Sequence, residues 1–442
     1  MPVVDRYDKM VLQFRDVLAE TERLSPEELE AYQRQLLEPL LLHARQHVPF
    51  YAQRLAPVFP GGKLDLDRFK EIPILARAQA QANANALAAV DLPPHVGAVM
   101  TEETSGSTGR PFVHRRNDLV TIANLGLTDR VLRWWDFDGS KTMATFISRH
   151  PERAPPPSGA TVTGWRTGFS GLHHIIDMWA DTDVQINWLL ERKPHYLTAY
   201  SSTLLALAER VQRRGVSLRF ERINSVATAM SDEIRQTCLE VLGVRPIDQF
   251  GAQEVGLIAC ECPVCGHYHV GAEAMHVEIL RDDDTPCSPG EIGRVVVTSF
   301  YNYAMPFIRY EIGDYAVAGP AKVKCPVRLP TLTRILGRYR NTFTLKDGRI
   351  IYPYVAIGRF RDFIPFEQVQ VVQTDYDAVE VRYVPLSKAK ADEAGLQAYL
   401  REAIDPSLHV CAKAVDEIPR SASGKFEDFL SLVPRQRVDH EQ

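Results

Sequence analysis

Hydrophobic positions near the start of the chain recur at the spacing of a helix. Ser25 and Pro26 supply an N-cap and a proline at the first helical position, and Glu28 completes a capping box. Apolar side chains follow near helical spacing at Leu29, Tyr32, Leu36, Leu37, Leu40 and Leu41. Pro39 falls inside this helix, where its ring removes one hydrogen bond, so we expect a kink. The Ala-, Gln- and Asn-rich segment 76–89 also predicts a helix.

From about Lys141, short apolar runs of strand length alternate with helical segments. The expected strands are 142–147, 196–199, 223–227 and 244–250, and the expected helices are 203–214 and 232–242. Gly215 and Gly243 stand where these two helices should end. The run 184–190 fits a strand or a helix. Strands that alternate with helices predict an α/β region with mainly parallel pairing.

The pattern changes after about residue 270, where strands are separated by Pro-Gly turns. The expected elements are strands at 275–280, 294–299, 368–374, 378–384 and 409–415, and a helix at 388–404. The elements from residue 368 onwards are expected to form a small α+β unit. We place the boundary near Gly337, which gives a large N-terminal domain, 1–336, and a small C-terminal domain, 337–442.

Composition narrows the class of protein. A chain of 442 residues has room for two domains. With 51 basic and 56 acidic residues it lacks the basic excess of nucleic-acid binders. No apolar run approaches the ~20 residues that cross a bilayer, and charges at Asp5 and Arg6 stand where a signal peptide is apolar. The odd number of cysteines, seven, favours reduced thiols, so we expect a cytoplasmic protein. From the charge balance and the lack of a long apolar run, we expect no nucleic-acid or membrane partner.

A Gly- and hydroxyl-rich segment is the strongest local sign of chemistry. It comprises Thr104, Ser105, Gly106, Ser107, Thr108, Gly109, Arg110 and Pro111. Glycines let the backbone approach a ligand closely. Hydroxyls, backbone N–H groups and the Arg110 cation can surround phosphate oxygens. Composition alone also allows a flexible loop without a ligand.

Cysteines and histidines are concentrated in the segment 260–269. Three cysteines and two histidines lie there, and Cys262 and Cys265 have the spacing of a zinc knuckle. The expected zinc ligands are Cys262, Cys265, His269 and Cys325, with Cys260 and His267 as substitutes. Four protein ligands would leave no open position, so such a site would be structural. The alternative is a group of free thiols.

Five segments, in the same order, resemble the motifs of the adenylate-forming superfamily, which comprises acyl-CoA synthetases, peptide-synthetase adenylation domains and luciferases. They are 104–111, 250–254, 310–314, 335–338 and 419–425. Within that superfamily the chain is most similar to the phenylacetate-CoA ligase family. This closer similarity rests on the segments 47–51, 72–75 and 304–310.

The resemblance implies an α/β fold and a reaction. The large multi-layer N-terminal adenylation domain would contain mainly parallel sheet regions and a β subregion, followed by a small, mobile α+β lid. The enzyme would activate a carboxylic acid, aromatic by this similarity, with ATP and Mg²⁺. An acyl adenylate and pyrophosphate would form, and the acyl group would then pass to coenzyme A.

The resemblance also implies roles for single residues. The 104–111 loop would hold the β- and γ-phosphates, with Gly251, Ala252 and Gln253 completing the ATP site. Glu254 would bind Mg²⁺, which prefers oxygen ligands. Asp314 would accept hydrogen bonds from the ribose hydroxyls, and Arg338 would reach the ribose or a phosphate. Lys425 would stabilise negative charge on the reacting oxygens. The acyl pocket would be formed by Phe146, Trp165, Tyr200, Ser201 and Phe250.

The chain departs from the family pattern at three places. Arg110 replaces a lysine, and Gln253 replaces a Thr or Ser. The segment after Arg338 lacks the aspartates that usually follow, one of which is the hinge of the C-terminal domain. An amine or a carrier protein therefore remains an alternative acceptor. A non-catalytic nucleotide-binding protein is the third hypothesis, and the oligomeric state is left open, with a homodimer among the options.

Overall fold

The computed structural model divides into two compact units. It describes residues 6–104, 112–147, 151–226, 230–338, 342–351, 353, 355, 357–386, 391–419 and 428–433. The first unit comprises residues 1–230 and 234–335, and the second comprises 336–442 with 231–233. None of the helices in the described ranges combines the length and apolar character needed to cross a membrane.

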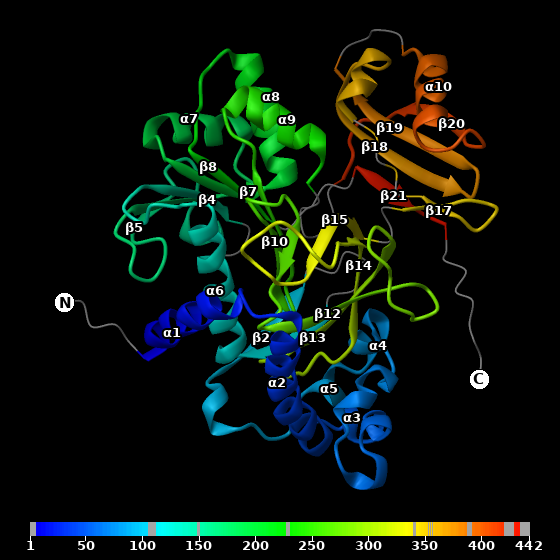
Figure 1. Ribbon diagram of the computed structural model, residues 1–442. Helices are drawn as coiled ribbons and strands as arrows, with labels where there is room; N and C mark the ends of the chain where they lie inside the picture. The colour runs from blue at the N-terminus through cyan, green and yellow to red at the C-terminus, as the bar shows by residue number, and fades with distance from the viewer. Residues whose placement is uncertain are drawn as a thin grey trace. The chain divides into compact units, whose positions relative to one another are not determined.

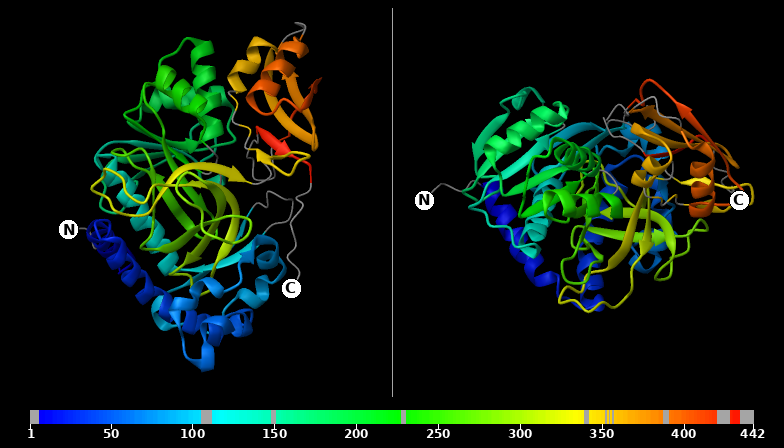
Figure 2. Two further views of the ribbon diagram at one scale, coloured as in Figure 1. Left: turned by 45° about the vertical axis from the view of Figure 1, so that its right-hand side comes forward. Right: turned by 90° about the horizontal axis from the view of Figure 1, so that it is seen from above.

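The chain begins with the helices α1 (Arg6–Thr21) and α2 (Pro26–His47) (Figure 2). α1 packs Leu18 against Ala123 and Leu127 of a later helix, and α2 donates from Gln33 Nε2 to the carbonyl oxygen of Ala272 at 2.7 Å.

The predicted capping box is present. The Ser25 amide donates to Glu28 Oε2 at 2.8 Å, and the Glu28 amide donates to Ser25 Oγ at 3.2 Å. α2 runs through Pro39, with Leu40 and Leu41 fully buried in the core.

The prediction of a single helix over 76–89 is partly wrong. The chain forms two short helices, α4 (Arg77–Ala82) and α5 (Ala84–Leu87). Asn83 separates them at φ −115° and ψ 23°, outside the helical region. Before them lie α3 (Tyr51–Arg54), short 3₁₀ turns at 56–58, 60–62 and 66–71, and β1 (Leu75–Ala76).

A parallel sheet forms the α/β part of the first unit. Its strands are β4 (Met143–Ile147), β6 (Leu172–Asp177), β7 (Tyr196–Tyr200), β8 (Arg222–Val226) and β9 (Ile247–Ala252). They pair in the order β9-β8-β7-β4-β6, all parallel, and β5 (Ala160–Thr163) adds an antiparallel edge. The predicted parallel pairing is confirmed.

Three helices gather beside β7 and β8 (Figure 1): α7 (Thr182–Arg192), α8 (Ser201–Arg214) and α9 (Asp232–Leu242). Their buried residues, such as Trp188, Leu207 and Cys238, share one hydrophobic cluster with Ala144 and Ile223 of the sheet. The run 184–190 is therefore helical. α6 (Asp118–Trp134) supplies Leu132 and Val131 to two smaller clusters that contain strand residues.

Antiparallel strands continue the same sheet. They are β10 (Gly256–Glu261), β11 (Tyr268–Val270), β12 (Met275–Leu280), β13 (Ile292–Ser299), β14 (Tyr310–Ala318) and β15 (Thr331–Arg338). Their order is β12-β13-β14-β15-β11-β10, and β10 joins β9. β1 pairs in parallel with β14, and β2 (Val99–Thr104) forms a separate hairpin with β3 (Phe112–Asn117). This is the expected β subregion.

The second unit is a small α+β body. Its sheet has the order β20-β19-β18-β21, formed by β18 (Phe366–Asp375), β19 (Ala378–Pro385), β20 (His409–Ala414) and β21 (Phe429–Ser431). α10 (Glu393–Ala403) buries Leu396 and Leu400 against it. A 3₁₀ segment (Ile357–Asp362) and the pair β16 (Phe343–Thr344) and β17 (Ile350–Ile351) precede this sheet.

A buried ion pair joins α1, α6 and the segment before β12. Arg130 Nη1 donates to both oxygens of Glu273 at 2.8 and 2.9 Å, and the Thr21 hydroxyl donates to Glu273 Oε1 at 3.0 Å. The exposed fractions of the two charged side chains are only 2% and 0%. Removing one partner would leave a buried charge without compensation.

We therefore expect Glu273→Gln to lower the free energy of unfolding by about 3–5 kcal/mol. All five tryptophans lie in the first unit, so urea unfolding followed by tryptophan fluorescence reports on it. Glu30→Gln is the matched control, because its side chain is 71% exposed and should contribute less than about 1 kcal/mol. Equal unfolding free energies for the two variants would contradict this account.

Candidate active site

A buried carboxylate lies in the turn between β9 and β10. This residue is Glu254, whose side chain is 2% exposed. Its Oε1 accepts a hydrogen bond from the Tyr310 hydroxyl at 2.8 Å and forms an ion pair with Arg77 Nη1. Arg77 Nη1 also donates to the Tyr310 hydroxyl at 3.0 Å. The 250–254 and 310–314 motifs therefore meet at Glu254 in the folded chain.

The strands on either side of the predicted phosphate loop also approach Glu254. Thr104 and Phe112 are paired at the end of the β2–β3 hairpin where the segment 105–111 connects the two strands. Gln253 Nε2 donates to the carbonyl oxygen of Glu103 at 3.4 Å, and the Arg77 guanidinium lies 5.6 Å from the centroid of the Phe112 ring. The structure thus places both flanks of the segment 105–111 beside the Glu254 turn.

Charge is concentrated around this carboxylate. Burial disfavours the Arg77 guanidinium, yet Glu254 and Tyr310 outweigh that effect and raise the pKa of Arg77. On β3, His114 is fully buried, with its Nε2 3.6 Å from Glu102 Oε2. Burial lowers the pKa of His114, although the carboxylates of Glu254 and Glu102 act in the opposite direction. The groups around Glu254 therefore include the Arg77 cation, the Tyr310 hydroxyl and the His114 imidazole, whose pKa burial lowers.

Asp314 belongs to the first unit, and Arg338 lies near the start of the second unit. Asp314 is buried in β14, and Arg338 is the half-buried last residue of β15. The glycine before each has a positive φ, 87° at Gly313 and 79° at Gly337. Because side chains other than glycine rarely adopt this conformation, each motif needs its glycine to turn the backbone just before the polar residue.

Several predicted residues fall outside the described part of the chain. These are Ser105, Gly106, Ser107, Thr108, Gly109, Arg110 and Lys425, and the side chain of Thr104. Gly251 and Ala252 are the last two residues of β9, and Gln253 begins the turn. The predicted roles of all these residues in ATP binding and catalysis stay predictions.

The five residues expected to form the acyl pocket do not form one cluster. Phe146, Trp165 and Phe250 are buried in three different hydrophobic clusters. Tyr200 ends β7, and Ser201 follows it with its hydroxyl 2.7 Å from the Ser225 hydroxyl. The structure brings Tyr200 and Ser201 to the carboxyl end of a parallel strand, where ligands of α/β sheets bind.

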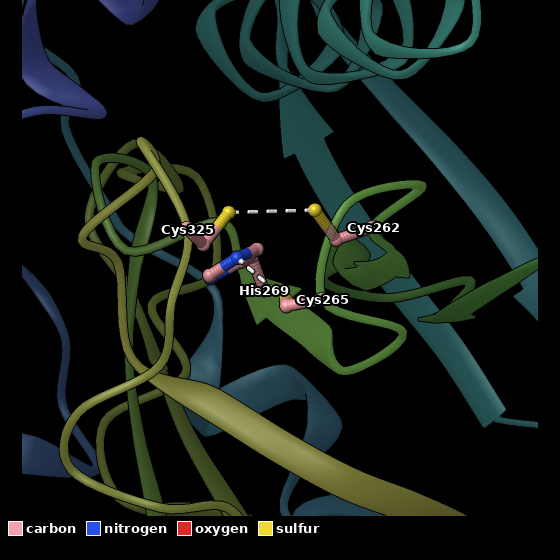
Figure 3. A group of neighbouring side chains, drawn as sticks. All are labelled: Cys262, Cys265, His269 and Cys325. Carbon is pink, nitrogen blue, oxygen red and sulfur yellow. Dashed lines mark hydrogen bonds between the residues drawn. The ribbon is translucent and has the colours of Figure 1, made fainter.

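The predicted metal ligands come together in space. The ligand atoms of Cys262, Cys265, His269 and Cys325 all lie within 4.8 Å of one another (Figure 3). Cys262 Sγ is 3.6 Å from Cys325 Sγ, and Cys265 Sγ is 3.5 Å from His269 Nε2. In a tetrahedron with metal–ligand bonds of about 2.0–2.3 Å, such edges measure roughly 3.5–3.8 Å. The donor set and its spacing therefore fit a four-coordinate metal ion.

Neighbouring groups act on two of these four ligands, His269 and Cys262. His269 Nδ1 lies 3.0 Å from the carbonyl oxygen of Leu329, which fixes Nε2 as the nitrogen that faces the cysteines. Burial opposes ionisation of Cys262, but hydrogen bonds from His269 and backbone amides lower the pKa of that thiol to about 6. The substitutes Cys260 and His267 are not part of the cluster. Cys260 belongs to a hydrophobic cluster with Val131.

Sequence reasoning missed Arg77 and Tyr310 as parts of the site. In the sequence, Tyr310 is the first residue of the 310–314 motif, and the motif assigns it no role of its own. Arg77 lies 177 positions before Glu254, so no local pattern connects the two. The only signal in the sequence is that Arg77 lies two positions after the end of the family-like segment 72–75.

Solved structures with a similar fold identify the fold class of this chain. A crystal structure of 2-hydroxyisobutyryl-CoA ligase in complex with 2-HIB-AMP matches with a TM-score of 0.72, covering 92% of this chain and 90% of that one at 15% identity. o-Succinylbenzoate coenzyme A synthetase of Bacillus subtilis, in complex with AMP, matches with a TM-score of 0.53, 14% identity, and coverage of 76% and 69%. The chain therefore has the fold of adenylate-forming enzymes.

Proteins related in sequence indicate a narrower group of enzymes than the fold does. The phenylacetate-coenzyme A ligase of Thermus thermophilus is 26% identical, over 93% of this chain and 98% of the relative. The ligase of the same name from Escherichia coli is 26% identical over 79% and 80%. No protein-family model matches the chain. These relatives confirm the resemblance to phenylacetate-CoA ligases that the motifs predicted.

Proposed function

We propose that this protein activates an aromatic carboxylic acid with ATP and transfers the acyl group to coenzyme A. The observation that supports the proposal best is the meeting of three predicted motifs at Glu254. Gln253 contacts β2, which leads into the phosphate loop, and Tyr310 binds the Glu254 carboxylate. The near full-length similarity to phenylacetate-coenzyme A ligases supports the aromatic acid and the acceptor.

The chemistry explains why such a site is needed. A carboxylate is a poor acyl donor. Its oxygen attacks the α-phosphorus of ATP, the bond to the β-phosphate oxygen breaks, and pyrophosphate leaves. The thiol of coenzyme A then attacks the acyl carbon, AMP leaves, and the thiol proton passes to solvent. The protein contributes mainly orientation and charge neutralisation to the first step.

Each predicted site residue has its own role in binding ATP or in the adenylation step. The 104–110 segment holds the β- and γ-phosphates, and Asp314 and Arg338 hold the ribose end of the nucleotide. Glu254 is a hard oxygen ligand, as Mg²⁺ requires, and Mg²⁺ commonly combines one or two protein carboxylates with substrate phosphates. Bound Mg²⁺ supplies positive charge to the polyphosphate. Lys425 stabilises the reacting oxygens.

Exchange of labelled pyrophosphate into ATP tests the adenylation step. We expect exchange only when an acid is present, with arylacetic and benzoic acids more active than short alkyl acids. Adding coenzyme A should then convert the acid to a thioester. Acid-dependent exchange that is followed by product only with an amine or a carrier protein would reassign the acceptor. No exchange with any acid would favour a non-catalytic nucleotide-binding protein.

For Lys425→Ala we expect adenylate formation to fall by at least about 10²–10³, the loss seen when one positioned donor to a developing charge is removed. Thioester formation from a supplied acyl adenylate should be largely retained. Lys413→Ala is the control, because Lys413 lies in β20 and pairs with Glu380 of the neighbouring strand. Normal adenylation by the Lys425 variant would remove Lys425 from the site.

We further propose that Cys262, Cys265, His269 and Cys325 bind a structural zinc ion. Sulfur and nitrogen donors in a tetrahedral arrangement favour zinc, and four protein ligands leave no position for a substrate. None of the seven cysteines, which all lie in the described residues, forms a disulfide. Reduced thiols of this kind suit the cytoplasm, where we place the protein.

Protein purified without added zinc should contain about one zinc ion per chain. Cys325→Ser should reduce both the zinc content and the melting temperature, because one ligand is lost while the acid and ATP sites are untouched. Cys411→Ser is the control, since Cys411 is exposed on β20 and far from the cluster in sequence. A zinc-free wild-type protein with normal stability would show that these cysteines are free thiols.

A further inference from the structure

Arg77 is held in place by the N-terminal segment of the first unit. It is the first residue of α4 and directly follows β1. β1 pairs in parallel with β14, in a register that places Leu75 opposite Tyr310. Arg54 fixes the same segment from the other side, because its Nη2 donates to the carbonyl oxygens of Pro73 at 3.1 Å and Ile74 at 2.7 Å.

A single guanidinium contacts three parts of the candidate active site. Arg77 pairs with Glu254 in the β9–β10 turn, donates to the Tyr310 hydroxyl at 3.0 Å, and lies 5.6 Å from the Phe112 ring centroid. Tyr310 opens the motif that ends in Asp314, and Phe112 begins the strand after the phosphate loop. These three segments are far apart in sequence, and Arg77 is a group common to all of them.

The contacts fix the orientation of the Glu254 carboxylate. The Tyr310 hydroxyl and Arg77 both bind Oε1, so this oxygen is held by two donors from two different strands or helices. The carboxylate is almost completely buried, where an anion without a nearby cation is costly. Binding of a polyphosphate would add negative charge close by, and the Arg77 cation offsets this repulsion.

We propose that Arg77 is a positioning residue of the adenylation site, which holds Glu254 by Oε1 so that the carboxylate can receive Mg²⁺ together with the polyphosphate of ATP. This inference rests on the function proposed above. It assigns to the N-terminal segment 75–82 a direct part in building the nucleotide site. Lysine at this position would keep the charge but not the planar guanidinium, whose Nη1 donates to both Glu254 and Tyr310.

Calorimetric binding titrations test the assignment without turnover. Mg²⁺·ATP and AMP are each titrated into the wild-type protein, Arg77→Ala, Arg77→Lys and Arg54→Ala. For Arg77→Ala we expect Mg²⁺·ATP affinity to fall by roughly 10-fold or more, the worth of a hydrogen bond to a charged group. AMP carries no β- or γ-phosphate, so its affinity should change much less. Arg77→Lys should recover part of the loss.

Arg54→Ala is the matched control, because it loosens the same segment without touching Glu254. We expect it to lower stability while the ratio of Mg²⁺·ATP to AMP affinity stays that of the wild type. Arg77→Ala protein that binds Mg²⁺·ATP as well as or better than the wild type overturns the proposal. If Arg77→Ala does not fold, Arg77→Gln is titrated in its place, because glutamine removes the charge but keeps much of the side-chain length. A wild-type affinity ratio in that variant also overturns the proposal. Wild-type protein that binds no Mg²⁺·ATP would instead contradict the proposed function.

Discussion

The packing of the first unit depends on one electrostatic requirement, which is that each buried glutamate needs a cation beside it. Glu273 is paired with Arg130, Glu278 with Arg309 through two hydrogen bonds of 3.0 Å, and Glu254 with Arg77. In each pair the partners are distant in sequence, so the charge on one segment is tolerated only when the other segment has docked. The pairs therefore specify how the N-terminal helices, the parallel sheet and the antiparallel strands fit together.

The same constraint builds the candidate active site. The Glu254 turn is fixed on one side by Arg77 and Tyr310 and continues into β10, which ends one residue before Cys262. Cys325 comes from a loop that is also attached to the N-terminal helices, because the Arg328 amide donates to the carbonyl oxygen of Glu22 at 2.8 Å. The cysteine cluster and the Glu254 contacts thus anchor the two ends of a single strand.

Local features of the fold were predictable from the sequence. The capping box at Ser25, the strand at 142–147 and the helix at 232–242 are confirmed, because each depends on neighbouring residues. The helix expected at 76–89 failed because alanine-rich composition does not reveal the break at Asn83, nor the pairing of β1 with β14. The cysteine ligands were predictable because knuckle spacing restricts them. Arg77 was not, because its partner is reached only through tertiary packing.

The central claim is that the enzyme forms an acyl adenylate, and the most direct test traces the carboxylate oxygen atoms of the acid into the products. An acid that supports pyrophosphate exchange is labelled with ¹⁸O in its carboxylate and converted with ATP and coenzyme A, and the nucleotide product is analysed by mass spectrometry. Attack of the carboxylate on the α-phosphorus predicts one ¹⁸O atom in each AMP molecule formed. Unlabelled AMP, or ADP accompanied by labelled phosphate, would contradict the account, because neither can arise from an acyl adenylate.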